Sequence, residues 1–175
     1  MLINLSELFS CQGKMKTYTP DLEMGQFQTP DGVCEIVEKA PVRLTIVNHG
    51  NRRMHVEGIA RLSLAMPCAR CLEPVAVPFD LEINQDLDLN QTEEERVEAL
   101  DEQPYISGYN LDVDQLVINE LLLNLPMKVL CKEDCKGICN QCGMNLNKGT
   151  CSCDKQSFDP RMSVIQDIFK QFKEV

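Results

Sequence analysis

The chain has 175 residues, enough for one compact domain with a small appendage, and 43% hydrophobic and 25% charged residues are typical of a globular protein. No apolar run approaches the roughly 20 residues that cross a bilayer, and the opening MLINLSELFS lacks the early positive charge of a secretion signal. The net charge is −10 and there are ten cysteines. We therefore expect a cytoplasmic protein, in a compartment where clustered cysteines indicate metal binding and disulfides are rare.

Three segments alternate apolar and polar side chains as strands with one buried face do: residues 42–47, 53–66 and 75–83. The His-Gly-Asn sequence at 49–51 predicts a turn, so the first two strands are expected to form an antiparallel hairpin. Pro78 falls on the polar face of the third strand and indicates a sheet edge or a bulge.

The link between the last two strands reads CARCLEP and carries Cys68 and Cys71, so this pair is expected at a turn between strands, a suitable platform for metal ligands. An acidic segment follows. Between residues 80 and 102 there are ten acidic residues and one basic residue, Arg96. The segment is interpreted as a solvated loop, at about 84–110, or as a docking surface for a basic partner. The candidate partner-binding residues are Glu93, Glu94, Glu95 and Glu98.

Helical periodicity appears at residues 113–125, which follow a capping residue, Asp112, and a capping-box partner, Gln115. Pro126 ends the helix. Its wide apolar band predicts packing across the sheet and consists of Val113, Leu116, Val117, Ile118, Leu121, Leu122, Leu123 and Leu125.

A second helix is predicted near the C-terminus, where Asp159 and Pro160 form an N-cap and first-turn pair. Its apolar stripe suits core packing or a partner site and consists of Met162, Ile165, Phe169 and Phe172. The expected fold class is α+β: an antiparallel barrel-like sheet with a packed helix, a cysteine-rich zinc module and a C-terminal helix. The expected division is a β-rich core domain at 1–126 and a zinc module with the terminal helix at 127–175.

Six cysteines lie between Cys131 and Cys153, separated by three, three, two, eight and one residues. Zinc takes four ligands in a tetrahedron, and a Cys-x-x-Cys turn supplies two thiolates from one bend. Gly143 follows such a turn, at a position where positive φ lets backbone N–H groups point at sulfur. The first expected zinc site consists of Cys139, Cys142, Cys151 and Cys153.

Four further cysteines in two close pairs are candidates for a second site: Cys68, Cys71, Cys131 and Cys135. Such a site would join the sheet to the cysteine module and close a loop of about 60 residues. In the alternative, Cys131 or Cys135 is a ligand of the first site and the early pair stays reduced. The isolated Cys11 and Cys34 are expected to be buried or partly buried free thiols.

Other cysteine chemistries fit less well. Cys135, Cys139 and Cys142 match the spacing of radical enzymes that use S-adenosylmethionine, but those resemble a barrel of about 200 or more residues with the motif early in the chain. A thioredoxin-like redox site needs a βαβ context, whereas the pair at Cys68 lies between antiparallel strands. Residues 128–175 have a net charge of only +2, a weak footprint for nucleic acid.

Enzyme chemistry finds little support. The two histidines, His49 and His55, lie in or beside the predicted hairpin, and His55 is read as an exposed bystander. There is no phosphate-binding glycine loop, no nucleophile elbow and no His-Glu metalloprotease motif. A zinc ion with four thiolate ligands leaves no open position to activate water. The sequence therefore predicts a protein that is not an enzyme.

The order of CARCLEP, the helix DVDQLVINELLLNLPMK, the motif CKEDCKGICNQCG with NLN after it, then CSC and FDPR resembles the YceD family of large ribosomal RNA subunit accumulation proteins. The resemblance runs from about residue 40 onward. It marks Cys68, Arg70, Cys71, Leu72, Pro74, Cys131, Cys135, Gly137, Cys139, Cys142, Gly143, Asn145, Leu146, Cys151 and Cys153.

The resemblance implies a bacterial cytoplasmic protein that acts in synthesis, processing or stability of the large-subunit (23S) ribosomal RNA. It also implies a partner, a small basic zinc-ribbon protein of the large ribosomal subunit, which the acidic segment would bind. The alternatives are a thiol redox protein and a zinc-ribbon module that binds ribosomal RNA directly through Arg70, Lys128, Lys132, Lys136 and Lys148.

Overall fold

The computed structural model describes residues 1–29, 32–91 and 103–153. Three long strands dominate it: β5 (Arg43–Gly50), β6 (Arg53–Pro67) and β7 (Pro74–Asp88). The β5–β6 hairpin is antiparallel, as predicted, and its turn residues Asn51 and Arg52 both have positive φ, as a tight two-residue hairpin turn requires. Strand β7 pairs with β6 along its whole length.

Three N-terminal strands that alternation did not reveal complete this sheet: β2 (Met15–Tyr18), β3 (Gln26–Thr29) and β4 (Gly32–Lys39). The strand order is β2-β5-β6-β4-β3, with β7 on the other side of β6. One edge of β6 is shared, since β5 pairs with its first half and β4 with its second half.

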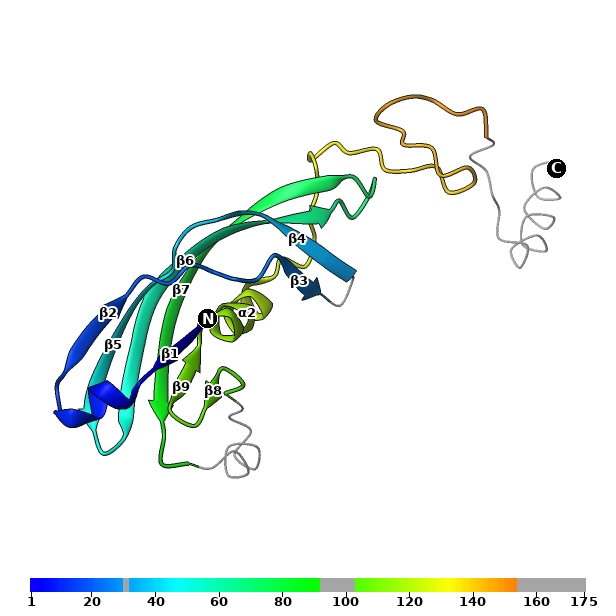
Figure 1. The fold of residues 1–175 in the computed structure, drawn as a ribbon. Coiled ribbons are helices and arrows are strands. Elements are labelled where there is room, and N and C mark those ends of the chain that lie inside the picture. Colours follow the sequence, from blue (N-terminus) through cyan, green and yellow to red (C-terminus); the bar gives the residue numbers. More distant parts are fainter. Residues whose placement is uncertain (30–31, 92–102, 154–175) are drawn as a thin grey trace, which may run out of the picture.

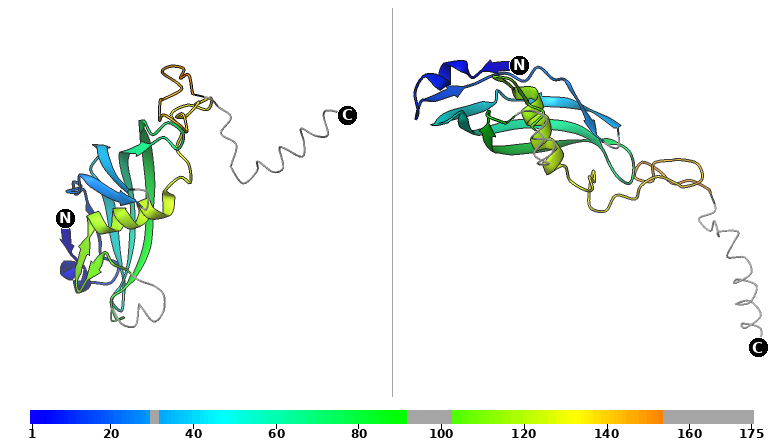
Figure 2. Two further views of the ribbon diagram at one scale, coloured as in Figure 1. Left: turned by 90° about the vertical axis from the view of Figure 1, so that its right-hand side faces the viewer. Right: turned by 90° about the horizontal axis from the view of Figure 1, so that it is seen from below.

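A smaller sheet of β1 (Leu2–Asn4), β9 (Asn110–Asp112) and β8 (Ile106–Ser107) lies beside a short 3-10 helix, η1 (Ser6–Ser10), and the helix α2 (Val113–Asn124). The carboxylate of Asp112 accepts hydrogen bonds from the backbone N–H groups of Asp114 and Gln115, so the predicted cap is confirmed. Helix α2 crosses one face of the long curved strands and packs against β7 (Figure 1, Figure 2).

The core lies between α2 and the sheet. Leu116, Val117 and Leu121 of the helix are fully buried, whereas Leu122 and Leu123 are 49% and 73% exposed, so the apolar band that packs is narrower than predicted. Glu120 is buried as well, and its carboxylate accepts a hydrogen bond from Gln85 Nε2 at 2.7 Å. This bond gives the buried carboxyl group a hydrogen-bond partner, without which it would destabilise the core.

The prediction of a barrel-like sheet with a packed helix is confirmed only in part, because the described strands form open sheets and no closed barrel. Strand β7 pairs only with β6 among these strands, and the apolar face is covered by α2 in place of a closing strand. Strand β7 lies at an edge of the described sheet, as Pro78 on its polar face indicated. The acidic loop was predicted too long: β7 continues to Asp88, while β8 and β9 occupy part of its second half.

Some predictions fall outside the described residues, namely the C-terminal helix and the four glutamates at 93, 94, 95 and 98. In the part of the chain that the structure describes, no helix combines the length and the apolar character needed to span a membrane.

Gly58 of β6 provides a test of this packing. A Cβ at this position would lie 2.4 Å from the backbone oxygen of Arg43 and 2.6 Å from Leu44 Cδ2. We expect Gly58→Ala to lower the free energy of unfolding by about 1–3 kcal/mol, measured by urea denaturation. The control is Gly25→Ala, where a Cβ meets nothing within 4 Å, and its change should stay within about 0.5 kcal/mol. Equal effects of the two substitutions would contradict the close approach of β5 and β6.

Candidate metal centre

The turn between β6 and β7 folds into a tight Cys-x-x-Cys bend. The backbone N–H of Leu72 donates to the carbonyl of Cys68 at 2.9 Å, and the N–H of Cys68 donates to the carbonyl of Glu73 at 2.8 Å. Leu72, directly after Cys71, has φ +61°, in the left-handed region. These contacts bring both sulfurs of the turn to one side, as ligands of a single ion require.

A second turn, at Cys139 and Cys142, repeats this geometry. The N–H of Gly143 donates to the carbonyl of Cys139 at 2.9 Å, and the N–H of Cys139 donates to the carbonyl of Met144 at 2.8 Å. Gly143 has φ +72° and occupies the same place in its turn as Leu72 does in the first. The chain therefore contains two equivalent ligand turns.

The first turn belongs to what we call the inner cluster: Cys68, Cys71, Cys131 and Cys135. The four sulfurs all lie within 4.8 Å of one another. The Sγ atoms of Cys68 and Cys135 are 3.9 Å apart, and those of Cys71 and Cys131 are 3.6 Å apart. A tetrahedral ion with metal–sulfur bonds of about 2.3 Å places its sulfurs about 3.8 Å apart, so these donors fit one.

The second turn belongs to the outer cluster: Cys139, Cys142, Cys151 and Cys153. Its four sulfurs also lie within 4.8 Å of one another. All four come from one segment, residues 139–153, whereas the inner cluster joins cysteines that are 60 and 67 positions apart in the chain. The cysteine module, residues 127–153, extends beyond the end of the β6–β7 hairpin (Figure 1).

Arg70 fastens the module to the hairpin. Its backbone oxygen accepts a hydrogen bond from the N–H of Ile138 at 3.1 Å, and its guanidinium donates to the carbonyl oxygens of Cys135 at 2.9 Å and Glu133 at 3.1 Å. Gly137 passes so close that a Cβ would lie 3.0 Å from the oxygen of Arg70. The bend therefore holds the module by hydrogen bonds as well as by sulfur.

Asn147 supports the inner cluster from outside the set of ligands, and sequence reasoning did not identify it. Its side-chain N–H donates to Cys135 Sγ at 3.2 Å, and its side-chain oxygen accepts from the N–H of Lys136 at 2.9 Å. Nearby, Lys148 Nζ lies 2.6 Å from a carboxylate oxygen of Glu73. The sequence offers one signal for this role, the segment NLNK after the second turn. The sequence alone does not show which cluster the side chains of this segment contact.

The thiols of each cluster differ in acidity. Backbone N–H groups of the third and fourth residues of each turn lower the pKa of its first cysteine, Cys68 or Cys139, to about 6. Partial desolvation by the surrounding chain and the neighbouring thiols raise the pKa of Cys131 to about 12. The hydrogen bond with Cys142 and partial desolvation raise the pKa of Cys153 to about 12. Each negative sulfur makes the next ionisation harder, so four thiolates need a bound cation to balance their charge.

The structure places the eight candidate ligands in the two groups of four that the spacing suggested. It does not place Cys131 or Cys135 with the outer four, as the alternative required. Of the isolated thiols, Cys34 is buried, whereas Cys11 is exposed, contrary to expectation. Both lie outside the two clusters.

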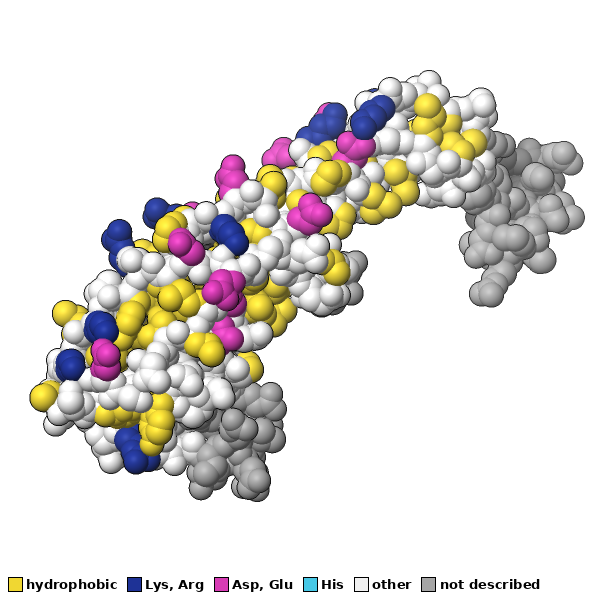
Figure 3. Space-filling view, viewed as in Figure 1, with side chains coloured by type: hydrophobic (Ala, Val, Ile, Leu, Met, Phe, Trp, Pro, Cys, Tyr) yellow, Lys and Arg dark blue, Asp and Glu magenta, His cyan; other side chains and the backbone are white. Residues whose placement is uncertain are grey.

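The candidate RNA-binding residues do not form one free basic surface. The guanidinium of Arg70 is engaged by backbone carbonyls, and Lys148 is paired with Glu73. On the face shown in Figure 3, acidic and basic side chains are interspersed.

His55, which the sequence analysis interpreted as an exposed bystander, lies between Asp86 at 2.6 Å and Glu57 at 3.1 Å. Its hydrogen bond with Asp86 raises the pKa of the imidazole.

Comparisons with known proteins relate the chain to several others. The chain is 30% identical to an uncharacterized protein of Mycobacterium tuberculosis over 45% of this chain and 38% of the relative. It is 27% identical to the uncharacterized protein YlbN of Bacillus subtilis over 62% of each chain. It is 22% identical to the large ribosomal RNA subunit accumulation protein YCED homolog 1, chloroplastic, of Arabidopsis thaliana, over 86% of this chain and 55% of the relative.

The matched regions thus span between 38% and 62% of these relatives' own lengths. No solved structure matches the chain. The family model described as large ribosomal RNA subunit accumulation protein YceD matches residues 56–169, which is more than half of the chain and includes all eight clustered cysteines. The chain therefore belongs to the YceD family of large ribosomal RNA subunit accumulation proteins.

Proposed function

We propose that the chain is a non-enzymatic ribosome biogenesis factor that acts in synthesis, processing or stability of the large-subunit ribosomal RNA. The family match over residues 56–169 carries this proposal, because the family's own description is the accumulation of that RNA. The chloroplast relatives from Arabidopsis and maize have the same description in their names.

Each cysteine cluster holds one zinc ion in this proposal. Four thiolates in tetrahedral arrangement favour zinc among the common divalent ions. Such a site is closed, so the ion supplies cross-linking of the chain and no activated water. The inner ion would fasten residues 131–135 to the β6–β7 turn, and the outer ion would hold residues 139–153 in their loop.

The partner in this proposal is a small basic zinc-ribbon protein of the large ribosomal subunit. The charge of the chain supports this choice, because ten acidic residues crowd between positions 80 and 102. On β7, Asp80 is already paired with Arg61, and Asp86 with His55. The carboxylates that we assign to the partner therefore lie further along the chain, at Glu93, Glu94, Glu95 and Glu98.

Metal content tests the zinc sites. Protein purified without chelator is expected to contain about two zinc ions per chain, measured by elemental analysis. Cys71→Ser should reduce this to about one, because it removes one inner ligand, while Cys11→Ser, outside both clusters, should keep about two. A full-length protein with less than half an equivalent of zinc and all thiols free would reject the metal sites.

Asn147→Ala tests the support of the inner cluster. The substitution leaves Cys135 Sγ without its side-chain donor, so we expect the affinity of one of the two ions to fall by about 10-fold, measured by competition with a chromophoric chelator. Asn140→Ala, at an exposed position in the second turn, is the control and should change neither affinity. Unchanged affinities in both variants would show that the hydrogen bond to sulfur does not contribute.

Affinity capture of the tagged full chain at low salt tests the partner. We expect one small basic ribosomal protein to remain bound after RNase treatment, and we expect replacement of Glu93, Glu94, Glu95 and Glu98 by Gln to reduce its capture at least about fivefold, because charge complementarity speeds encounter.

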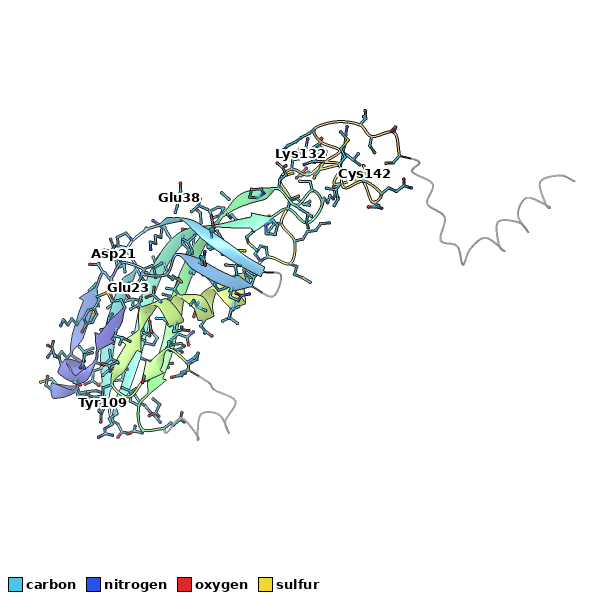
Figure 4. All side chains as sticks on the ribbon, turned by 45° about the vertical axis from the view of Figure 1, so that its right-hand side comes forward. Asp21, Glu23, Glu38, Tyr109, Lys132 and Cys142 are labelled. Atoms are coloured by element: carbon cyan, nitrogen blue, oxygen red, sulfur yellow. The ribbon has the colours of Figure 1, made fainter. Side chains whose placement is uncertain are left out.

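The matched control removes the same amount of charge elsewhere, by amide replacement of Asp21, Glu23, Glu35 and Glu38, all of them exposed and three of them labelled in Figure 4. Equal capture by both variants would reject the acidic segment as the docking surface. Loss of all ribosomal material on RNase treatment would instead support direct binding of ribosomal RNA.

A further inference from the structure

We propose that the two clusters hold metal with unequal lifetimes: the inner cluster is a permanent cross-link, and the outer cluster is an exchangeable site for a thiophilic divalent ion. This inference rests on the proposal that both clusters bind zinc. It assigns to the outer cluster a response to the availability of metal, which a purely structural cross-link would not have.

Burial separates the clusters first. In the inner cluster, three of the four ligands are buried: Cys68, Cys71 and Cys135 are 0%, 5% and 4% exposed, while Cys131 is exposed. In the outer cluster none of the four ligands is buried: Cys142 is exposed and the other three are half-buried. A competing ligand or an oxidant must reach the ion or its sulfurs, and the reactivity of a thiolate follows its exposure. Attack is therefore easier at the outer cluster.

The two clusters also differ in how firmly their surroundings are attached to the β6–β7 hairpin. Around the inner cluster, the N–H of Ala69 donates to the carbonyl of Val129 at 2.8 Å, and the N–H of Cys131 donates to Cys68 Sγ at 3.4 Å. Arg70 adds its bonds to Ile138 and Cys135. Loss of the inner ion would expose three buried thiols beneath these contacts, so opening this cluster requires separation of the module from the hairpin.

Opening the outer cluster requires much less. Its ligands belong to one segment, and the isolated bridge between Ile138 and Asn145 closes the base of the second turn without help from Cys151 or Cys153. Those two cysteines can leave while the first part of the segment keeps its hydrogen bonds. Local openings of this kind cost less free energy than global unfolding, so the outer ion exchanges while the sheet and the inner ion persist.

The experiment follows zinc release and thiol exposure together in the full chain. Zinc-loaded protein is mixed with excess chromophoric chelator, and samples are pulsed with N-ethylmaleimide and analysed by peptide mass spectrometry. We expect release in two phases of about one equivalent each, the first at least 10-fold faster. Alkylation during the first phase should fall on Cys139, Cys142, Cys151 and Cys153.

Variants assign the phases. The pair Cys151→Ser and Cys153→Ser should abolish the fast phase and keep the slow one, while Cys11→Ser should keep both. Release of both ions in a single phase, or earlier alkylation of the inner cysteines, would overturn the inference. Zinc content before the chelator is added measures the proposed function separately: two equivalents that leave together would preserve the zinc proposal and reject unequal lifetimes, and an absence of zinc would reject both.

Discussion

The approach of Cys131 and Cys135 to the β6–β7 turn is the contact on which the position of the cysteine module depends. It joins segments more than 60 residues apart, so it closes a long loop that contains β7, the acidic segment, β8, β9 and helix α2. Four thiols within 4.8 Å of one another cannot all ionise without a cation, yet three of them are buried. A bound cation would supply the charge that balances four thiolates and would hold the module at this turn, together with the hydrogen bonds of Arg70.

The long hairpin explains why the module lies where it does. Strands β6 and β7 pair from Arg53 opposite Asp88 to Pro67 opposite Pro74, and the ligand turn caps their far end. Helix α2 packs against β7 away from the ligand turn. After α2 ends, the chain continues through Pro126 into the module. Figure 4 accordingly shows Lys132 and Cys142 at one end of the molecule and Tyr109 toward the other. The fold thus presents a metal-bearing tip on a sheet whose core is complete without it.

Sequence patterns predicted the parts of this structure whose signals are local. Alternation identified β5, β6 and β7 because each is long with one buried face, and the Asp112 cap identified the start of α2. The strands before residue 40 were not predicted, because β2 and β3 are short and a register shift between Ile36 and Glu38 interrupts the alternation of β4. Whether the sheet closes was not readable from any strand alone, because closure depends on pairing between distant edges. For the same reason the cysteine pairs suggested both clusters but left the inner one as one of two alternatives, while the contacts of Arg70 and Asn147 required the tertiary structure.

The two ligand turns share one backbone path but not one residue type at its strained position. Gly143 adopts φ +72° without steric cost, whereas Leu72 at φ +61° costs roughly 1–2 kcal/mol. A side chain persists in that region only where its surroundings hold the backbone firmly. The first turn has such surroundings, since it is fixed by two long strands, by Val129 and by the contacts of Arg70. The second turn is held only at its base, where Ile138 and Asn145 bond to Arg70 and Glu73, and it uses the residue that needs no such support. The residue at this one position therefore reports how firmly each turn is held, and it agrees with the difference in burial between the inner and the outer sulfurs.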